Sequence, residues 1–317
     1  MPQMDQIVAA TERVWLKTLE DSFFLGQPIL EYYFKHGKIN HASGRKIVEP
    51  IIQARTNGQF YKGITAMAPQ DNNEVGAAEY DWVFSEEYAL IAGDEMWMNE
   101  GDAGKIKLWD SKVKIAGASL AERWGAALHA DGNVLTGADT RLVPTPFEAM
   151  ADDGNTFNVG GMTSDDVALW QGQRTPGGGA ALTIKMVEVG YLAASEGRFH
   201  PDALEFSKAG YAMFFSLIQT AQRYVGADKK VGFQNLLFND ATVFADSNIL
   251  TTGGNFTNQR LFYHNTDKCR LTCAEGMEFV TEEKQIDAHA YCQVIRFAGN
   301  FTTNGRRYIG VLDNFTV

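Results

Sequence analysis

The stretch that decides the fold is EYDWVFSEEYALIAGDEMWMNEGDAGKIKLWDSKVKIAGASLAERWGAALHADG, which runs from Glu79 to Gly132. Its first part alternates apolar and polar residues with a period of two, which is typical of a strand with one apolar face. The apolar residues that share one parity are Tyr80, Trp82, Phe84, Tyr88, Leu90 and Ala92. We therefore expect one continuous strand with this parity on its apolar face.

The second part of the stretch has a helical period. From Asp102 onward, apolar residues recur at steps of three or four, which places them on one stripe of a helix. They are Ile106, Trp109, Val113, Ala116, Leu120, Trp124 and Ala127. Asp102 can cap the first turn, and Gly132 lies where a left-handed terminating residue costs little. A helix from Asp102 to Ala130 would be about 43 Å long. Because this length exceeds that of an ordinary helix in a compact domain, we expect something extended to rest on it.

Composition narrows the class of protein. The chain has 317 residues, of which 45% are hydrophobic and 12% aromatic, so it can form a packed core of one large or two ordinary domains. Its formal net charge of −11 repels nucleic-acid phosphates and disfavours a dedicated nucleic-acid binder. No apolar run approaches the roughly 18–20 residues that cross a bilayer, and no signal peptide precedes the first helix. We therefore expect a protein made in the cytosol, without a membrane partner.

The flanking segments predict two projections. Residues 5–25 have the period of a helix, and the segment that follows, to Asn40, reads as an extended arm whose aromatic residues dock elsewhere. Residues 45–54 read as a strand, which must lie at an edge or contain a bulge because it includes Pro50. A long, turn-rich excursion separates this strand from the strand that begins at Glu79, which predicts a projecting hairpin. In a compact enzyme it would be a lid, whereas in an assembly it would be an arm that lies on a neighbour.

The rest of the chain predicts a mixed α+β structure. Residues 135–178 are poor in period, and two helices are expected over 180–196 and 207–224. Alternating segments over 231–248 and 259–273 predict further strands. A strand around 286–294 and a return strand at 306–312 would form a terminal hairpin, with Asn304-Gly305 as the turn.

Candidate chemistry is sparse. The cysteines Cys269, Cys273 and Cys292 form no CxxC pair and predict free thiols, with a zinc site as the alternative. Gly177-Gly178-Gly179 lacks the partners of a phosphate loop and is interpreted as a hinge. The acidic pairs at 152–153 and 165–166 lack calcium-loop spacing and are interpreted as solvated carboxylates.

The histidines and lysines add no recognisable site. The six histidines are scattered, and neither HExxH nor GxSxG is present, so we expect no catalytic residue, no cofactor site and no metal site. A lysine cluster on the first half of the long helix is either a solvated face or a face toward acidic neighbours or packaged nucleic acid. Its members are Lys105, Lys107, Lys112 and Lys114.

The order of elements carries a family resemblance. An aromatic arm precedes a GRKIVEPI strand, a YKG tip and an EYDW return. The long helix ends in LHADG, a segment beginning NTFNVGGMTSDDVALW enters the middle of the chain, and GNFTTNGRRYIGVL stands near the end. Together these segments resemble the major capsid protein of tailed bacteriophages, over nearly the whole chain. The resemblance implies the Hong Kong 97 phage-type capsid fold.

The resemblance also implies a division of the chain. It predicts an N-terminal arm over about 1–43 and an extended β-hairpin loop over about 44–93. A peripheral domain would comprise 94–134, with the long spine helix, and 263–317, with the C-terminal strands. An axial domain would comprise 135–262. Such a subunit would assemble through hexamers and pentamers into an icosahedral head that encloses double-stranded DNA.

The implied partners are other copies of the chain, a separate scaffolding protein, a portal, a decoration protein and packaged DNA that is bound without sequence specificity. The implied location is the virion, after synthesis in the host cytoplasm. Candidate inter-subunit contacts are Phe34, Phe60, Tyr61, Lys62, Trp82, Arg306 and Arg307. Some relatives crosslink a loop lysine to a neighbour's asparagine, for which Lys62 with Asn300 or Asn304 are the candidates. The alternatives are an encapsulin-like compartment around enzyme cargo, or a hydrolase with residues 56–77 as its lid.

Overall fold

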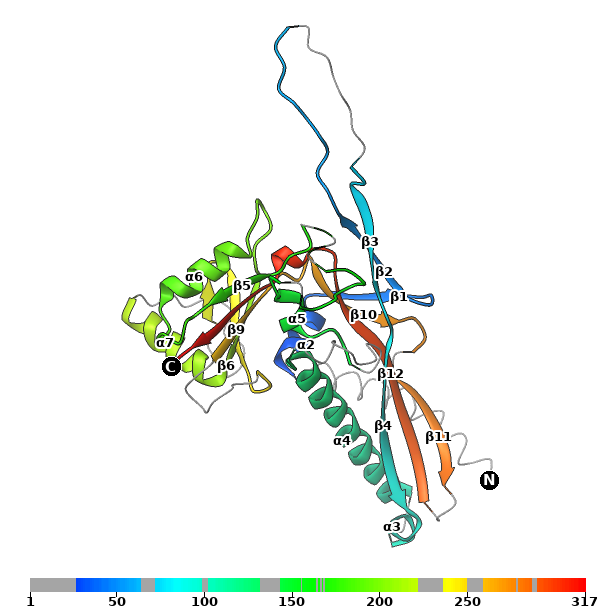
Figure 1. Ribbon diagram of the computed structural model, residues 1–317. Coiled ribbons are helices and arrows are strands. Elements are labelled where there is room, and N and C mark those ends of the chain that lie inside the picture. Colours follow the sequence, from blue (N-terminus) through cyan, green and yellow to red (C-terminus); the bar gives the residue numbers. More distant parts are fainter. Residues whose placement is uncertain are drawn as a thin grey trace.

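The computed structural model describes residues 27–63, 72–98, 102–131, 143–154, 156–163, 165, 167, 169–221, 236–249, 259–277, 279–286 and 290–317. These residues form a mixed α+β fold with a five-stranded sheet, a six-stranded sheet and a separate two-stranded hairpin (Figure 1). The mixed fold class is therefore confirmed. No helix in this part of the chain is long and apolar enough to cross a membrane. The predicted helix over 5–25 and the predicted helix end at Gly132 lie outside the described residues.

The long helix is α4 (Asp102–Leu128), 27 residues that span about 40 Å. The predicted apolar stripe faces the core, since Val113, Ala116, Leu120 and Trp124 are all buried. The indole of Trp124 lies edge-on to Phe297, with ring centroids 5.1 Å apart. The periodicity therefore predicted both this helix and the face it buries.

Helix α4 packs against the five-stranded sheet, as Figure 1 shows. The central strand of this sheet, β12, pairs with β10, β11 and β4, and β10 also pairs with β1. The strands are β1 (Ile39–Ala42), β4 (Val83–Ala92), β10 (Cys269–Ala274), β11 (Val280–Ile286) and β12 (Ala290–Thr303). A short helix, α3 (Gly93–Met98), follows β4 and precedes α4. The three cysteines lie on β10 and β12 of this sheet, are buried and form no disulfide, as predicted.

The single strand expected from Glu79 onward is wrong, because the chain breaks at Asp81-Trp82 and the buried parity changes there. The first piece, β3, ends at Tyr80, and β4 begins at Val83. The buried apolar residues of β4 are Val83, Ala89 and Ile91, and the exposed ones are Phe84, Tyr88 and Leu90. Two non-strand residues between the pieces let the chain reverse its faces, and no signal in the alternation reveals this.

The hairpin predicted before the long helix is confirmed. Strands β2 (Ile47–Ile52) and β3 (Val75–Tyr80) pair antiparallel, with Pro50 opposite Ala77. Proline is accommodated because β2 has no ladder partner other than β3 among the described residues. In Figure 1 the described parts of the connection extend far from both larger sheets.

The second sheet has helices on one face. Its strand order is β5-β13-β9-β6-β8-β7. The strands are β5 (Gln173–Pro176), β6 (Ala203–Ser207), β7 (Leu236–Phe238), β8 (Ala241–Asp246), β9 (Gln259–His264) and β13 (Gly310–Phe315). Helices α6 (Ile184–Ala193) and α7 (Lys208–Ala221) cover one face around a core that includes Phe206, Phe214 and Tyr263. Both helices agree with the predicted segments.

A cap and a glycine turn set the start of α6. The side chain of Thr183 accepts a hydrogen bond from the backbone N–H of Met186, which satisfies an otherwise free donor of the first turn. Gly178 and Gly179 form a turn with φ of 62° and 71°, a backbone conformation that favours glycine. The glycine run thus joins β5 to α6, and its hinge role stays a prediction.

The extended arm predicted up to Asn40 is wrong for its described part. Residues Pro28–Lys35 form a helix, α2, with proline in its first turn. The ring of Tyr33 is buried edge-on to Phe301, with centroids 5.1 Å apart, and the Tyr32 hydroxyl donates to the Asp202 carbonyl over 2.9 Å. These aromatic residues therefore dock on their own chain. The sequence pattern does not reveal α2, because two helical turns are too short to show a period.

The predicted terminal hairpin is also wrong. Strand β12 ends at Thr303, a 3-10 turn follows at Arg306–Tyr308, and β13 then enters the six-stranded sheet between β5 and β9. Asn304-Gly305 therefore carries the chain from one sheet to the other. Strand β13 is buried on both faces, since Val311 lies in one core and Leu312 in the other. The residues of β13 consequently do not share a sheet with β12, whereas the predicted peripheral domain implied that they would.

Candidate assembly surface

The projecting hairpin exposes apolar residues that its own chain does not cover. Phe60 is 109% and Tyr61 64% exposed in the segment that follows β2. On β2 and β3, one face buries Ile47 and Ile51, while the other exposes an apolar set. That set comprises Val48, Ile52 and Val75. Exposed apolar residues gathered on a projection mark a protein contact.

The base of the hairpin is fixed to the body of the molecule by hydrogen bonds. The Tyr80 hydroxyl donates to the Thr303 carbonyl over 2.9 Å and accepts from the Thr303 N–H over 3.2 Å. The backbone N–H of Glu79 donates to the Gly160 carbonyl over 2.9 Å. Burial raises the pKa of Tyr80 well above its usual range, so the hydroxyl keeps its proton. The projection thus starts from a rigid base.

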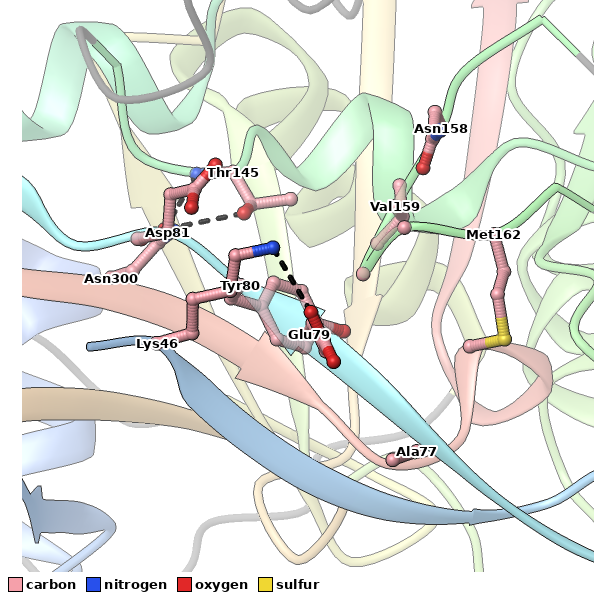
Figure 2. Close-up of a pocket in the computed structure, with 12 residues that line it drawn as sticks. Lys46, Ala77, Glu79, Tyr80, Asp81, Thr145, Asn158, Val159, Met162 and Asn300 are labelled. Carbon is pink, nitrogen blue, oxygen red and sulfur yellow. Dashed lines mark hydrogen bonds and ion pairs between the residues drawn. The ribbon is translucent and has the colours of Figure 1, made fainter. Parts of the chain in front are cut away.

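A hollow of about 430 Å³ lies beside this base (Figure 2). The hairpin contributes one wall, and the segment Asn158–Met162 and the pair Thr145 and Asn300 contribute the rest. An ion pair between Lys46 Nζ and Glu79 Oε2, 2.9 Å long, lies at the hollow, with both side chains about half exposed. Such an exposed pair adds little stability.

Two predicted contact residues of this region are used within the chain. Trp82 is 7% exposed, and its indole N–H donates to the Gly44 carbonyl over 2.8 Å. Asn300 is buried, accepts hydrogen bonds from the N–H and hydroxyl of Thr145, and donates to the Asp81 carbonyl. Neither side chain is available to a neighbour, so the roles predicted for Trp82 and for Asn300 as a crosslink acceptor are wrong. A crosslink from Lys62 to Asn304 stays a prediction.

Arg306 corrects a further prediction. Its side chain is 0% exposed, and its guanidinium donates to the backbone carbonyls of Ala149, Met150, Asp152 and Trp170 over 2.8–3.3 Å. It therefore holds the loop after α5 (Phe147–Ala151) against the turn before β13 and cannot touch a neighbour. Burial lowers its pKa, and the four carbonyl acceptors compensate the buried charge.

The loop after α5 also corrects the interpretation of Asp152 as a solvated carboxylate. Asp152 is buried and lies 3.8 Å from Arg174 Nη1, at the edge of an ion-pair group. In the same group Arg174 Nη2 lies 2.6 Å from Asp313 Oδ2, and Arg260 Nη1 lies 3.0 Å from Glu148 Oε2. Asp152 is thus structural, because Arg174 of β5 lies beside it, whereas its neighbour Asp153 is exposed, as the interpretation expected.

The remaining candidates divide in the same way. Phe34 packs against the main core, and Arg307 pairs with Glu196 and contacts Tyr308. Lys62 is exposed beside Tyr61 on the projection. Of the seven candidates, the structure places only Phe60, Tyr61 and Lys62 on one exposed segment.

Strand β4 presents a second exposed apolar surface, which sequence reasoning missed. Phe84, Tyr88 and Leu90 are 64%, 54% and 48% exposed. Within the described residues β4 pairs only with β12, so it lies at an edge of its sheet. An edge strand with three exposed apolar residues is a ready site for association.

One member of the predicted lysine cluster on α4 is paired within the helix. Lys114 Nζ lies 2.8 Å from Asp110 Oδ2, one turn earlier.

A buried charged group lies between the end of α4 and the second sheet. His129 Nε2 and His264 Nε2 contact the two oxygens of Glu205 over 2.9 and 2.8 Å. Burial alone would raise the pKa of Glu205, but the two imidazoles outweigh it and lower the pKa to about 2. Burial alone would lower the pKa of His129, but Glu205 outweighs it and raises the pKa to about 9. The scattered spacing of these residues gave no sign of this group.

Known proteins resemble this chain in structure rather than in sequence. No protein-family model and no curated protein matches the sequence. Solved structures do match: the capsid of cyanophage A-1(L) has a TM-score of 0.61 at 12% identity, over 88% of this chain and 91% of that one. The capsid of a native GTA particle has a TM-score of 0.60 at 11% identity, over 88% of both chains. A Synechococcus elongatus encapsulin has a TM-score of 0.55 at 8% identity, over 90% of this chain and 88% of that one. The likeness thus extends over most of each chain.

Proposed function

We propose that this chain, which has the Hong Kong 97-type fold of phage capsid proteins, is the major capsid protein of a tailed double-stranded DNA bacteriophage. The observation that carries the proposal is the projecting hairpin, which is anchored at its base. It bears Phe60 and Tyr61, two exposed side chains that the core of the subunit does not cover. The subunits assemble through hexamers and pentamers into an icosahedral head that encloses the genome.

The mechanism is geometric. Each hairpin reaches a neighbouring subunit and buries its apolar face there, at roughly 25 cal/mol per Å² of apolar surface. A single contact of this kind is weak, but each subunit gives one and receives one, and closure of the shell multiplies them. The exposed face of β4 supplies a further contact to the same assembly.

The predicted arm over 1–43 and the predicted extended loop over 44–93 each contribute a strand, β1 and β4, to the sheet around β12. We therefore propose a peripheral domain that contains α4 and this whole sheet, an extended loop that is limited to the β2–β3 hairpin, and an axial domain that contains the six-stranded sheet. Because β13 pairs with β5 and β9, we assign Gly310–Phe315 to the axial domain. The predicted domain boundary between residues 262 and 263 falls within β9, two residues before that strand ends.

The proposed partners are copies of the chain, a scaffolding protein, a portal, a decoration protein and packaged DNA. The proposed location is the virion, after synthesis in the host cytoplasm, and the proposed role is structural rather than enzymatic. A net charge of −11 suits a container that confines DNA without binding it tightly.

The hydrolase alternative is weakened because the described parts of its lid point away from the body of the molecule (Figure 1).

Electron microscopy of the purified, concentrated protein tests the proposal. We expect closed shells, with light scattering that rises sharply above a threshold concentration. A single species of one or two chains under every assembly condition would overturn the proposal.

The encapsulin-like compartment is the second candidate, because an encapsulin shares the fold over 90% of this chain. The contents of particles isolated from the native source separate the two candidates. Nuclease-protected double-stranded DNA supports the phage head, whereas enzyme cargo without DNA supports the compartment.

A further inference from the structure

A candidate metal site lies where the end of α4 meets the second sheet, away from both exposed apolar surfaces. His129 follows α4, Glu205 is on β6 and Asp246 is on β8. One ligand atom from each of the three lies within 4.8 Å of the other two. All three residues are at most 1% exposed. The group is therefore enclosed, as structural metal sites are.

The pairing of the strands creates this juxtaposition. Strands β6 and β8 are parallel, with Ser207 opposite Asp246, so Glu205 and Asp246 project from the same face of the sheet. Strand β9 is antiparallel to β6 and brings His264 to the same face. The helix that ends beside this face supplies His129.

Each of the three side chains is oriented by a hydrogen bond through its other polar atom. His129 Nδ1 donates to the Gly125 carbonyl over 2.7 Å, and Glu205 Oε2 accepts from His264 Nε2 over 2.8 Å. Asp246 Oδ1 accepts from the Asn248 N–H over 2.7 Å. Such outer contacts are what fix metal ligands in proteins. They leave His129 Nε2, Glu205 Oε1 and Asp246 Oδ2 as the inner atoms.

The charges of the group call for a cation. Asp246 Oδ2 is buried and accepts no hydrogen bond from a described residue. Glu205 is already paired with His129 and His264, whereas Asp246 makes no ion pair with a described residue, and a buried carboxylate without a counter-charge costs several kcal/mol. A single divalent ion would neutralise both carboxylates while His129 binds it as neutral imidazole.

We infer that His129, Glu205 and Asp246 bind one divalent ion of the zinc or manganese class, which joins the end of the long helix to the second sheet. One imidazole and two carboxylates suit these ions. In a tetrahedral zinc site neighbouring ligand atoms lie roughly 3.3–3.6 Å apart, because each is about 2.0–2.2 Å from the ion. On binding, the proton on His129 Nε2 goes to solvent, and the nitrogen lone pair bonds to the metal.

The test measures metal in the subunit and is independent of shell assembly. The full-length chain is unfolded, refolded with ZnCl2 or with MnCl2, dialysed and analysed by mass spectrometry of its metal content. We expect about one ion per chain for the wild type and binding at least about tenfold weaker for Asp246→Asn. Asp240→Asn removes an exposed carboxylate near the same strand and should retain the wild-type content.

A second measurement covers the case in which Asp246→Asn does not fold. The wild type refolded with either ion should melt at a higher temperature than the wild type refolded with a chelator, by mass action. Wild-type protein that retains neither ion, or that melts identically with and without chelator, would overturn the inference. So would a folded Asp246→Asn chain with the wild-type metal content.

Discussion

Leu120→Ala is the change that best tests the packing of the long helix. Leu120 is 0% exposed in the core between α4 and the five-stranded sheet. The change removes apolar groups worth about 2 kcal/mol in transfer free energy, and the remaining cavity adds to this loss. Alanine favours a helix slightly more than leucine does, which offsets only a few tenths of a kcal/mol. We therefore expect the free energy of unfolding to fall by about 3–4 kcal/mol.

The assay is urea unfolding of the unassembled subunit, followed by circular dichroism. Ile115→Ala is the matched control, because Ile115 is 63% exposed on the same helix, and it should change the free energy of unfolding by less than about 0.5 kcal/mol. Equal losses of unfolding free energy from the two variants would refute the assignment of the faces of α4, provided that the slope of the unfolding free energy against urea concentration is unchanged. Such a result would mean that the buried and exposed faces of the helix had been assigned wrongly.

Three further predictions concern the surfaces and the buried arginine. Tyr61→Ala should leave the unfolding free energy of the subunit within about 0.5 kcal/mol and raise the threshold concentration for assembly, as measured by light scattering; unchanged assembly would exclude Tyr61 as a contact. Leu90→Asn on the exposed face of β4 should likewise spare the fold and weaken assembly, and a large loss of subunit stability would show that this face is an internal one. Arg306→Met should lower the unfolding free energy by about 3–5 kcal/mol, because four backbone carbonyls lose their donor; a loss below about 1 kcal/mol would contradict the burial seen here.

Local elements were predictable where their signals are short in range. The stripe of α4 repeats every three or four residues, and the interior proline of β2 requires either an edge position or a bulge. Both signals arise from backbone geometry within a few residues, so no distant segment can alter them. The order of the elements then led to the fold that the solved capsid structures share with this chain.

The exposed part of the assembly surface was predictable only at the hairpin. Phe60 and Tyr61 lie in a turn-rich excursion that no core could cover, whereas Trp82 and Arg306 are equally large and equally suited to an interface. The sequence does not show that the Gly44 carbonyl accepts a hydrogen bond from the Trp82 indole, or that four backbone carbonyls accept from Arg306. Partners of this kind come from segments far along the chain.

By itself, the sequence determined the long helix, the edge hairpin, the mixed α+β class and the absence of any recognisable catalytic motif. Only the tertiary structure decided which face of β4 is buried, which sheet receives β13, and that His129 meets Glu205, 76 positions later. The physical reason is the same in each case. Periodicity records how a segment lies relative to its own axis, whereas burial and charge pairing depend on which distant segment packs against it.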